Sequence, residues 1–323
     1  MHARLALPLF ALATLAVAPV RAQTMADARS CERAITGSAV DRAAMQKLYA
    51  SGRTTPAGHF AAGCADVLAS RWDSAAAHFD AAAKGNPSSS AAFLWIGNIA
   101  GQRARMAPLA ARLKLAPMIR DAYAKAIELD GTNIDAREGL MQFQLEAPST
   151  IGGDKAKAAE QALAIGRLVP YRGLAAEIAV ATAARNQPAA ERLLLRATTQ
   201  FPDSVLGWAN LSAMQADGQR APDAFATVTR WQARGTNRMF ALFALGRTAA
   251  VTGQQRERGE QALRQYLRGQ RSPSDPPFAN AHHRLGMIFE RAGRKDDARV
   301  EFQAALRLSP QMRDAQFALD RLK

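Results

Sequence analysis

Aromatic residues are scarce in this sequence. They make up 7% of the 323 residues, whereas alanine is the most abundant residue. A core of small side chains requires its elements to lie close together, and alanine has the lowest free-energy cost of any residue in a helix. The composition therefore favours packed helices over a β-sandwich or barrel. With 48% hydrophobic and 22% charged residues, wholesale disorder is also excluded.

Long apolar runs are lacking as well, except at the start of the chain. Arg4 precedes the apolar stretch Leu5–Val20, which is too short to span a bilayer. Ala22 then provides the small residue that signal peptidase requires. We therefore expect residues 1–22 to be a secretory signal peptide, cleaved near Ala22, and the protein to be periplasmic. Because no later stretch is long and apolar enough to span a bilayer, we expect no stable membrane insertion.

Cysteine is limited to Cys31 and Cys64. The absence of a Cys-x-x-Cys pair leaves thiol redox catalysis without support. Both cysteines would remain after cleavage and would face an oxidising compartment. An even pair under those conditions predicts a disulfide that ties an N-terminal segment to the helices that follow. Two buried free thiols are the alternative.

Motifs of common catalytic centres are missing. The sequence has no His-Glu-x-x-His zinc-protease motif, no Gly-x-Ser-x-Gly nucleophile elbow and no G-x-x-x-x-G-K-[ST] phosphate loop. His282 and His283 are adjacent, so on a helix their side chains point about 100° apart and do not share one metal ion. We therefore expect no catalysis, no cofactor and no metal site.

Charge is strongly of one sign. The chain has 42 Lys and Arg against 28 Asp and Glu, a formal net charge of +14, and most of the basic residues are arginine. This excess favours acidic partners such as an anionic polysaccharide or lipid headgroups, whereas export argues against nucleic acid. A GC-rich genome also produces a chain rich in arginine and alanine, and both explanations stay open.

What the sequence does contain is a pattern that repeats with a period of about 34 residues, as helix-turn-helix arrays do. Its clearest copies are residues 279–312 and 56–89. The interval from Gly286 to Pro310 in the first copy equals that from Gly63 to Pro87 in the second. The positions between these ends also match, with Ala298, Phe302 and Ala305 in one copy and Ala75, Phe79 and Ala82 in the other.

Two antiparallel helices that nest closely explain this pattern. Glycine in the first helix and two alanines in the second let the backbones approach, and the aromatic residue between the alanines fills the gap. Proline after the second helix blocks its continuation. The pattern resembles the tetratricopeptide repeat. The resemblance implies an all-α, right-handed superhelical solenoid of antiparallel helix pairs, whose concave groove binds a protein or peptide partner.

Weaker copies fill the rest of the chain. Insertions enlarge the copy at 90–133 and, before Ala262 and Tyr266, the copy at 239–276. The predicted organisation is a signal peptide at 1–22, an N-terminal helical segment or cap at 23–55, about seven repeats within 56–311 (56–89, 90–133, 134–170, 171–204, 205–238, 239–276 and 279–312), and a C-terminal capping helix at 312–323.

One loop departs from the repeat. Residues 147–155 join two helices with more residues than the repeat allows, and they include Gly152 and Gly153. Paired glycines permit positive φ, and Asp154 is placed to cap the helix that begins at Lys155. A glycine-rich loop before a helix also suggests an anion site. Because Asp154 would repel an anion there, we interpret the loop as structural.

Partner-binding residues follow from the resemblance, since the first helix of each pair lines the groove in tetratricopeptide repeat proteins. The side chains predicted there are Asp135, Glu138, Phe240, Phe243, Arg247, His283, Arg284 and Arg291. The acidic ones lie in the third unit and the basic ones in the sixth and seventh, which would orient a ligand with acidic groups toward one end. Ordinary solvated faces are the alternative.

We therefore expect a non-catalytic periplasmic scaffold that binds a protein or peptide partner in the groove. A binder of an anionic envelope polymer or lipid headgroups, acting through its basic surface, is the alternative. Salt dependence separates the two, because capture by charge alone weakens as ionic strength rises.

Overall fold

The computed structural model describes residues 31, 39–51 and 54–322, and these residues contain α-helices, one 3₁₀ turn and no β-strand. The predicted signal peptide lies outside the described residues. Short turns join the helices, which are α2 (Ala39–Ser51), α3 (Pro56–Leu68), α4 (Trp72–Gly85), α5 (Ser90–Met106), α6 (Leu109–Leu129), α7 (Ile134–Glu146), η1 (Ser149–Ile151), α8 (Lys155–Leu168), α9 (Pro170–Ala183), α10 (Gln187–Gln200), α11 (Val205–Asp217), α12 (Ala221–Arg234), α13 (Arg238–Thr252), α14 (Arg256–Arg268), α15 (Phe278–Arg291), α16 (Lys295–Leu308) and α17 (Arg313–Arg321).

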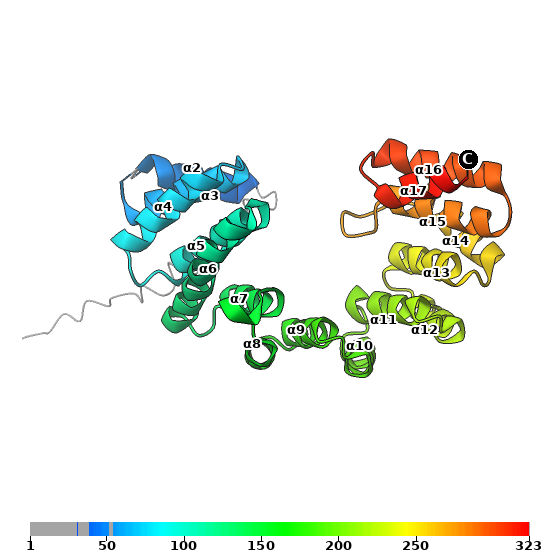
Figure 1. Ribbon diagram of the computed structural model, residues 1–323, viewed down its shortest axis with the longest axis horizontal. Helices are drawn as coiled ribbons and strands as arrows, with labels where there is room; N and C mark the ends of the chain where they lie inside the picture. The colour runs from blue at the N-terminus through cyan, green and yellow to red at the C-terminus, as the bar shows by residue number, and fades with distance from the viewer. Residues whose placement is uncertain (1–30, 32–38, 52–53, 323) are drawn as a thin grey trace, which may run out of the picture. The chain divides into compact units, whose positions relative to one another are not determined.

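The chain divides into two compact units, residues 1–168 and 169–323. In the first unit α3 packs on α4, α5 on α6, and α7 on α8, and each pair also contacts the next (Figure 1). In the second unit the pairs are α9 with α10, α11 with α12, α13 with α14, and α15 with α16. The predicted all-α fold of packed helix pairs is confirmed. No helix within the described ranges is long and apolar enough to cross a membrane.

Glycine and an aromatic ring meet inside three of these pairs. A Cβ added to Gly63 would lie 2.8 Å from Cζ of Phe79, and one added to Gly286 would lie 2.5 Å from Cε1 of Phe302. The same relation holds between Gly97 and Tyr123, at 2.7 Å. The helices are therefore close enough that only hydrogen fits at the glycine. The predicted role of glycine and aromatic residue in helix nesting is confirmed.

The pair α13–α14 departs from the predicted alignment. A Cβ on Gly246 would lie 2.2 Å from Cγ of Leu263, so leucine takes the place of the aromatic ring. The extra residues expected before Ala262 and Tyr266 lie instead after α14. They lengthen the connection to α15, which spans residues 269–277. Leu263 has no aromatic ring to mark it, so a pattern based on aromatic residues places the second helix of this unit one turn too late.

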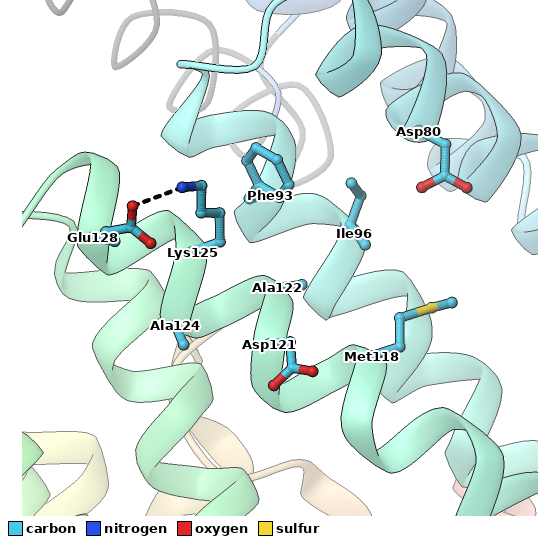
Figure 2. Close-up of a pocket in the computed structure, with 9 residues that line it drawn as sticks. All are labelled: Asp80, Phe93, Ile96, Met118, Asp121, Ala122, Ala124, Lys125 and Glu128. Atoms are coloured by element: carbon cyan, nitrogen blue, oxygen red, sulfur yellow. Dashed lines mark hydrogen bonds and ion pairs between the residues drawn. The ribbon is translucent and has the colours of Figure 1, made fainter.

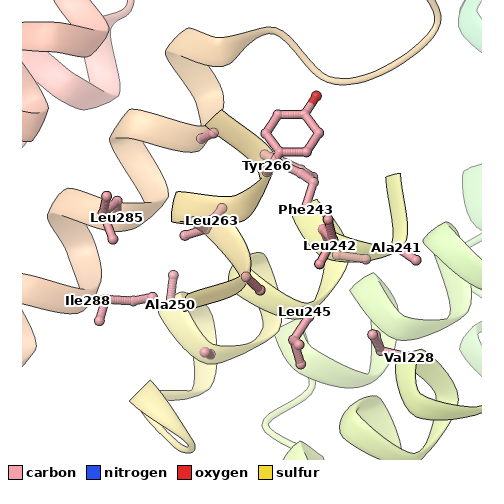
Figure 3. Close-up of a cluster of buried hydrophobic side chains, with 14 of the residues drawn as sticks. Val228, Ala241, Leu242, Phe243, Leu245, Ala250, Leu263, Tyr266, Leu285 and Ile288 are labelled. Carbon is pink, nitrogen blue, oxygen red and sulfur yellow. The ribbon is translucent and has the colours of Figure 1, made fainter. Parts of the chain in front are cut away.

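Helix α13 is the centre of the core of the second unit. It contacts α11, α12, α14 and α15, and its residues from Ala241 to Gly246 are all buried. Figure 3 shows Phe243 of α13 beside Tyr266 of α14, with Leu285 and Ile288 of α15 on the other side of the cluster. Between Ala241 and Ala250 of this helix Arg247 alone is not buried, so a partner can reach this stretch of α13 only there.

The loop between α7 and α8 is fixed by its glycines and by Asp154. Gly152 has φ 108°, and a Cβ on Gly153 would lie 1.7 Å from the carbonyl oxygen of Ala147. The backbone N–H groups of Ala156 and Lys157 donate to Oδ1 of Asp154 at 2.9 and 3.1 Å. The predicted helix cap is therefore confirmed.

A disulfide joins Cys31 to Cys64 in the structure, with Cα atoms 5.6 Å apart. Both residues are fully buried in a cluster that includes Phe60 and Phe79. Because Cys64 lies on α3 and Cys31 precedes α2, the bond ties the N-terminal segment to the first helix pair.

Candidate functional site in the second unit

Two of the predicted groove residues, Arg247 and Arg284, lie on neighbouring first helices. Arg247 is on α13 and Arg284 on α15, and α13 packs between α11 and α15. The core beneath holds both helices in place, since Leu245 and Leu285 are buried there. The two guanidinium groups are near enough for the charge of Arg247 to lower the pKa of Arg284, after burial, which is the larger cause.

Arg247 binds the last residue of α11. Its Nη2 donates to both carboxylate oxygens of Asp217, at 3.0 and 2.8 Å. The Arg247 side chain is 21% exposed, whereas that of Asp217 is 59% exposed. Nη1 of Arg247 is buried and has no hydrogen-bond partner among the described residues. A single exposed carboxylate thus uses only part of the donor capacity of this guanidinium.

Arg284 lacks even one such carboxylate. Its Nη1 contacts Sδ of Met287 at 3.1 Å, a weak acceptor. No carboxylate oxygen in the described part of the chain lies within 4.0 Å of the Arg284 guanidinium, which is the limit for an ion pair. Asp217 and Asp314 act on it from farther away and oppose the lowering of its pKa. We call Arg247, Arg284, Asp217 and Asp314 the arginine face. A carboxylate from outside the chain fits the guanidinium of Arg284, whereas Nη1 of Arg247 is buried and its Nη2 already binds Asp217.

Two predicted groove residues belong to the core instead. Phe243 is 7% exposed and packs on Tyr266, with ring centroids 5.6 Å apart. His283 is 8% exposed, and its ring lies 5.7 Å from that of Phe302. Burial, and then the charge of Arg284, lowers the pKa of His283 to about 4. The prediction that these two residues line the groove is wrong because neighbouring helices cover their positions on the first helices.

Acid is expected to destabilise the second unit through His283. The folded pKa of about 4 lies below the usual 6.5, so the unfolded chain binds the proton first as the pH falls through that interval. Stability present at pH 7 should therefore fall by about 1 to 2 kcal/mol between pH 7 and 5. Urea unfolding of wild type and His283→Gln at both pH values measures it. If the free energy of unfolding fell equally in wild type and variant between pH 7 and 5, a role for His283 would be contradicted.

The other predicted groove residues do not join the arginine face. Phe240 is half-buried against Trp231, with ring centroids 5.7 Å apart. Arg291 is exposed at the end of α15, and its Nη1 lies 2.7 Å from where a Cβ on Gly253 would stand. Asp135 and Glu138 are half-buried on α7, in the first unit.

The first unit contains a cavity of about 580 Å³ between α4, α5 and α6. Figure 2 shows Phe93, Ile96 and Met118 on its walls among side chains of both charges. Lys125 pairs with Glu128 at 2.6 Å, so part of this charge is already neutralised. Within the described ranges, no group of three or more His, Cys, Asp or Glu residues could hold a metal ion.

Asp217 and Asp314 were missed as members of the site. Each lies at an end of its helix, α11 or α17, and not at a central groove position. A signal exists for Asp217, which precedes Arg247 in the sequence by close to one repeat length. Comparing helix ends between successive units could therefore have found it.

Residues 279–312 match the sequence profile of the tetratricopeptide repeat. This segment is similar to one tetratricopeptide repeat, and the fold of the chain is that of tetratricopeptide repeat structures. A tetratricopeptide repeat protein from Parabacteroides merdae is 14% identical, over 80% of this chain and 95% of that one, with a TM-score of 0.53. Yeast Tom70 is 12% identical, over 98% of this chain and 66% of that one, with a TM-score of 0.60. The comparison with curated proteins finds no match.

These likenesses confirm the solenoid of helix pairs that the repeat period predicts. Tetratricopeptide repeat proteins bind protein partners, and the fold suggests a scaffold for protein interactions.

Proposed function

We propose that this protein is a non-catalytic periplasmic scaffold that binds an acidic segment of a protein partner at the arginine face. One observation carries the proposal. Two half-buried guanidinium groups on neighbouring first helices have only one close carboxylate among the described residues, that of Asp217, and it pairs with Arg247. A guanidinium presents a planar fork that matches a carboxylate, so aspartate or glutamate of a partner would use the donors of Arg284.

The arginine face favours a protein segment over a uniformly anionic polymer. Asp217 and Asp314 lie beside the two arginines and would repel a polymer that carries a negative charge on every unit. A peptide can place one or two carboxylates on the arginines and leave neutral residues opposite the aspartates. This matching of charged and neutral peptide residues to the arginines and aspartates contributes more to specificity than to affinity.

Substitution of the arginines tests this proposal. Arg247→Gln with Arg284→Gln should weaken capture of the partner by about tenfold to a hundredfold, because charged hydrogen bonds are lost. The matched control is Arg299→Gln with Arg313→Gln, which removes the same charge elsewhere. Arg299 pairs with Asp296 at 2.6 Å, and Arg313 is exposed. The control should change capture by no more than about twofold.

The partner for this test comes from crosslinking in intact cells, and its affinity for each purified variant is then measured at two salt concentrations. Melting of each variant is recorded as well, because Arg284 is half-buried. An equal loss in both double variants, abolished by salt, would favour the anionic-polymer binder and overturn the protein-segment proposal. No loss in either would exclude the arginine face.

The periplasmic location is supported by two features. A basic start precedes the apolar stretch Leu5–Val20, and Cys31 and Cys64 are bonded. Disulfides persist mainly in oxidising compartments. The mass of the protein recovered from cells should correspond to a chain that begins after Ala22. A cytosolic chain that keeps residues 1–22 would contradict the location.

A further inference from the structure

Two enlarged parts of the first unit, the helix pair α5–α6 and the loop between α7 and α8, lie in contact. Helices α5 and α6 have 17 and 21 residues, whereas α3 and α4 have 13 and 14. The extended α6 contacts η1, the 3₁₀ turn in the loop between α7 and α8. Between them lies a cavity of about 570 Å³, lined by residues of α5, α6, α7 and this loop. Its volume is within the range of small-molecule sites.

The walls of this cavity are largely apolar. The larger side chains that line it are Leu109, Leu113, Ile119, Phe143, Pro148 and Ile151. Leu109 is 71% exposed and Leu113 46% exposed, so apolar surface stays open to water at this place. Covering such surface with an apolar ligand is favourable.

The loop wall is held in one conformation. Gly153 donates its N–H to the carbonyl of Pro148 at 3.0 Å, and Asp154 donates to that of Gln144 at 2.8 Å. Since a side chain at Gly153 would overlap the carbonyl of Ala147, glycine is required for this path. The cavity is thus built into the fold and does not depend on a ligand to form.

Tyr123 contributes a polar group to the cavity. Its ring lies between Gly97 and Gly139, since a Cβ on either would come within 2.7 Å of the ring. Its hydroxyl donates to Oδ1 of Asn98 at 2.8 Å, and both residues line the cavity. Burial raises the pKa of Tyr123 to about 12, and the nearby charge of Arg105 opposes this rise. Arg105 lines the same cavity as this phenol.

Two arginines at the cavity bind only neutral acceptors within the described residues. Arg105 donates from Nε and Nη2 to Oε1 of Gln102, at 3.2 and 2.7 Å. Arg112 donates from Nε to the carbonyl of Ala107 at 2.8 Å. Glu146 also lines the cavity and accepts a hydrogen bond from Gln142. Two guanidinium groups against one carboxylate leave the lining with an excess of positive charge.

We propose that this cavity binds a small amphiphile, with one carboxylate and one unbranched apolar chain, of the fatty-acid class. The apolar chain would cover Leu109, Leu113 and Ile151, and the carboxylate would accept hydrogen bonds from Arg105 and Arg112. The inference stands apart from the arginine face, which lies in the other unit.

Calorimetric titration of the full chain with dodecanoate, below its critical micelle concentration, tests the proposal. We expect one molecule bound per chain. Dodecyltrimethylammonium has the same chain and the opposite charge, and it should bind at least about tenfold more weakly. Absence of dodecanoate binding would overturn the proposal, and so would equal affinity for the two amphiphiles.

Variants then locate the site. Gly101 lines the cavity, and a Cβ there would have no atom within 4 Å, so Gly101→Leu should fill the space without disturbing the helix. It should abolish binding of dodecanoate. Arg105→Gln with Arg112→Gln should weaken binding of dodecanoate about tenfold or more and remove the preference for the anion. Lys114→Gln, an exposed charge on the same helix outside the cavity, is the control. Unchanged binding by Gly101→Leu would overturn the assignment.

Discussion

Replacing Gly286 by valine is expected to lower the free energy of unfolding by about 3 kcal/mol. A Cβ at this position would lie 2.5 Å from the ring of Phe302, which is fully buried and has no room to move. Helices α15 and α16 would have to separate, and the core shared with α13 would lose contacts. Urea unfolding of wild type and variant measures the difference.

Gly101→Val provides the matched control. Gly101 also lies inside a helix, α5, but a Cβ there would meet no atom within 4 Å. Loss of glycine in a helix is itself favourable by about a few tenths of a kcal/mol for valine. Stability should therefore stay within about 0.5 kcal/mol of wild type. Equal destabilisation by the two substitutions would show that close helix approach is not the reason for Gly286.

Removing the disulfide is expected to cost about 3 to 4 kcal/mol in the first unit. The two cysteines are 33 residues apart, and closing a loop of that length restricts the unfolded chain. Cys31→Ala with Cys64→Ala should therefore speed hydrogen exchange in α2, α3 and α4. Exchange in α15 and α16 should not change, because each repeat contacts only its neighbours.

Reduced wild type should match the double variant in this experiment. Thiol labelling of the unfolded, unreduced protein should find no free thiol. Two reactive thiols per chain, or an unchanged exchange pattern in the double variant, would contradict the role given to the bond between Cys31 and Cys64.

The fold was largely predictable because its determinants are local. The contact of Gly63 with Phe79 and that of Gly286 with Phe302 each lie within one helix pair, so a fixed spacing in sequence records each contact. The prediction was wrong in α14, where Leu263 takes the place of the aromatic ring. A leucine side chain is large enough to fill the space beside the glycine, and a pattern based on aromatic residues does not recognise a leucine there.

The candidate site was less predictable because burial depends on more than one repeat. Arg247 follows Gly246 by one residue and Arg284 precedes Gly286 by two, so in the register of the repeat they differ by about one helical turn and face the same way. Phe243 and His283 share those helices but are covered by adjacent ones. The cavity beside Tyr123 was not predicted at all, because it forms where two insertions meet outside the repeat pattern.

Photo-crosslinking in intact cells tests the arginine face most directly. A photoreactive amino acid replaces Asp314, which is exposed and near Arg284, or Arg307, which is exposed on α16. Position 314 should yield a discrete adduct with one protein that contains an acidic segment, and position 307 should not. The adduct should disappear when Arg247 and Arg284 are both replaced by glutamine. The same adducts at both positions, or an adduct that persists without the two arginines, would contradict binding at this face.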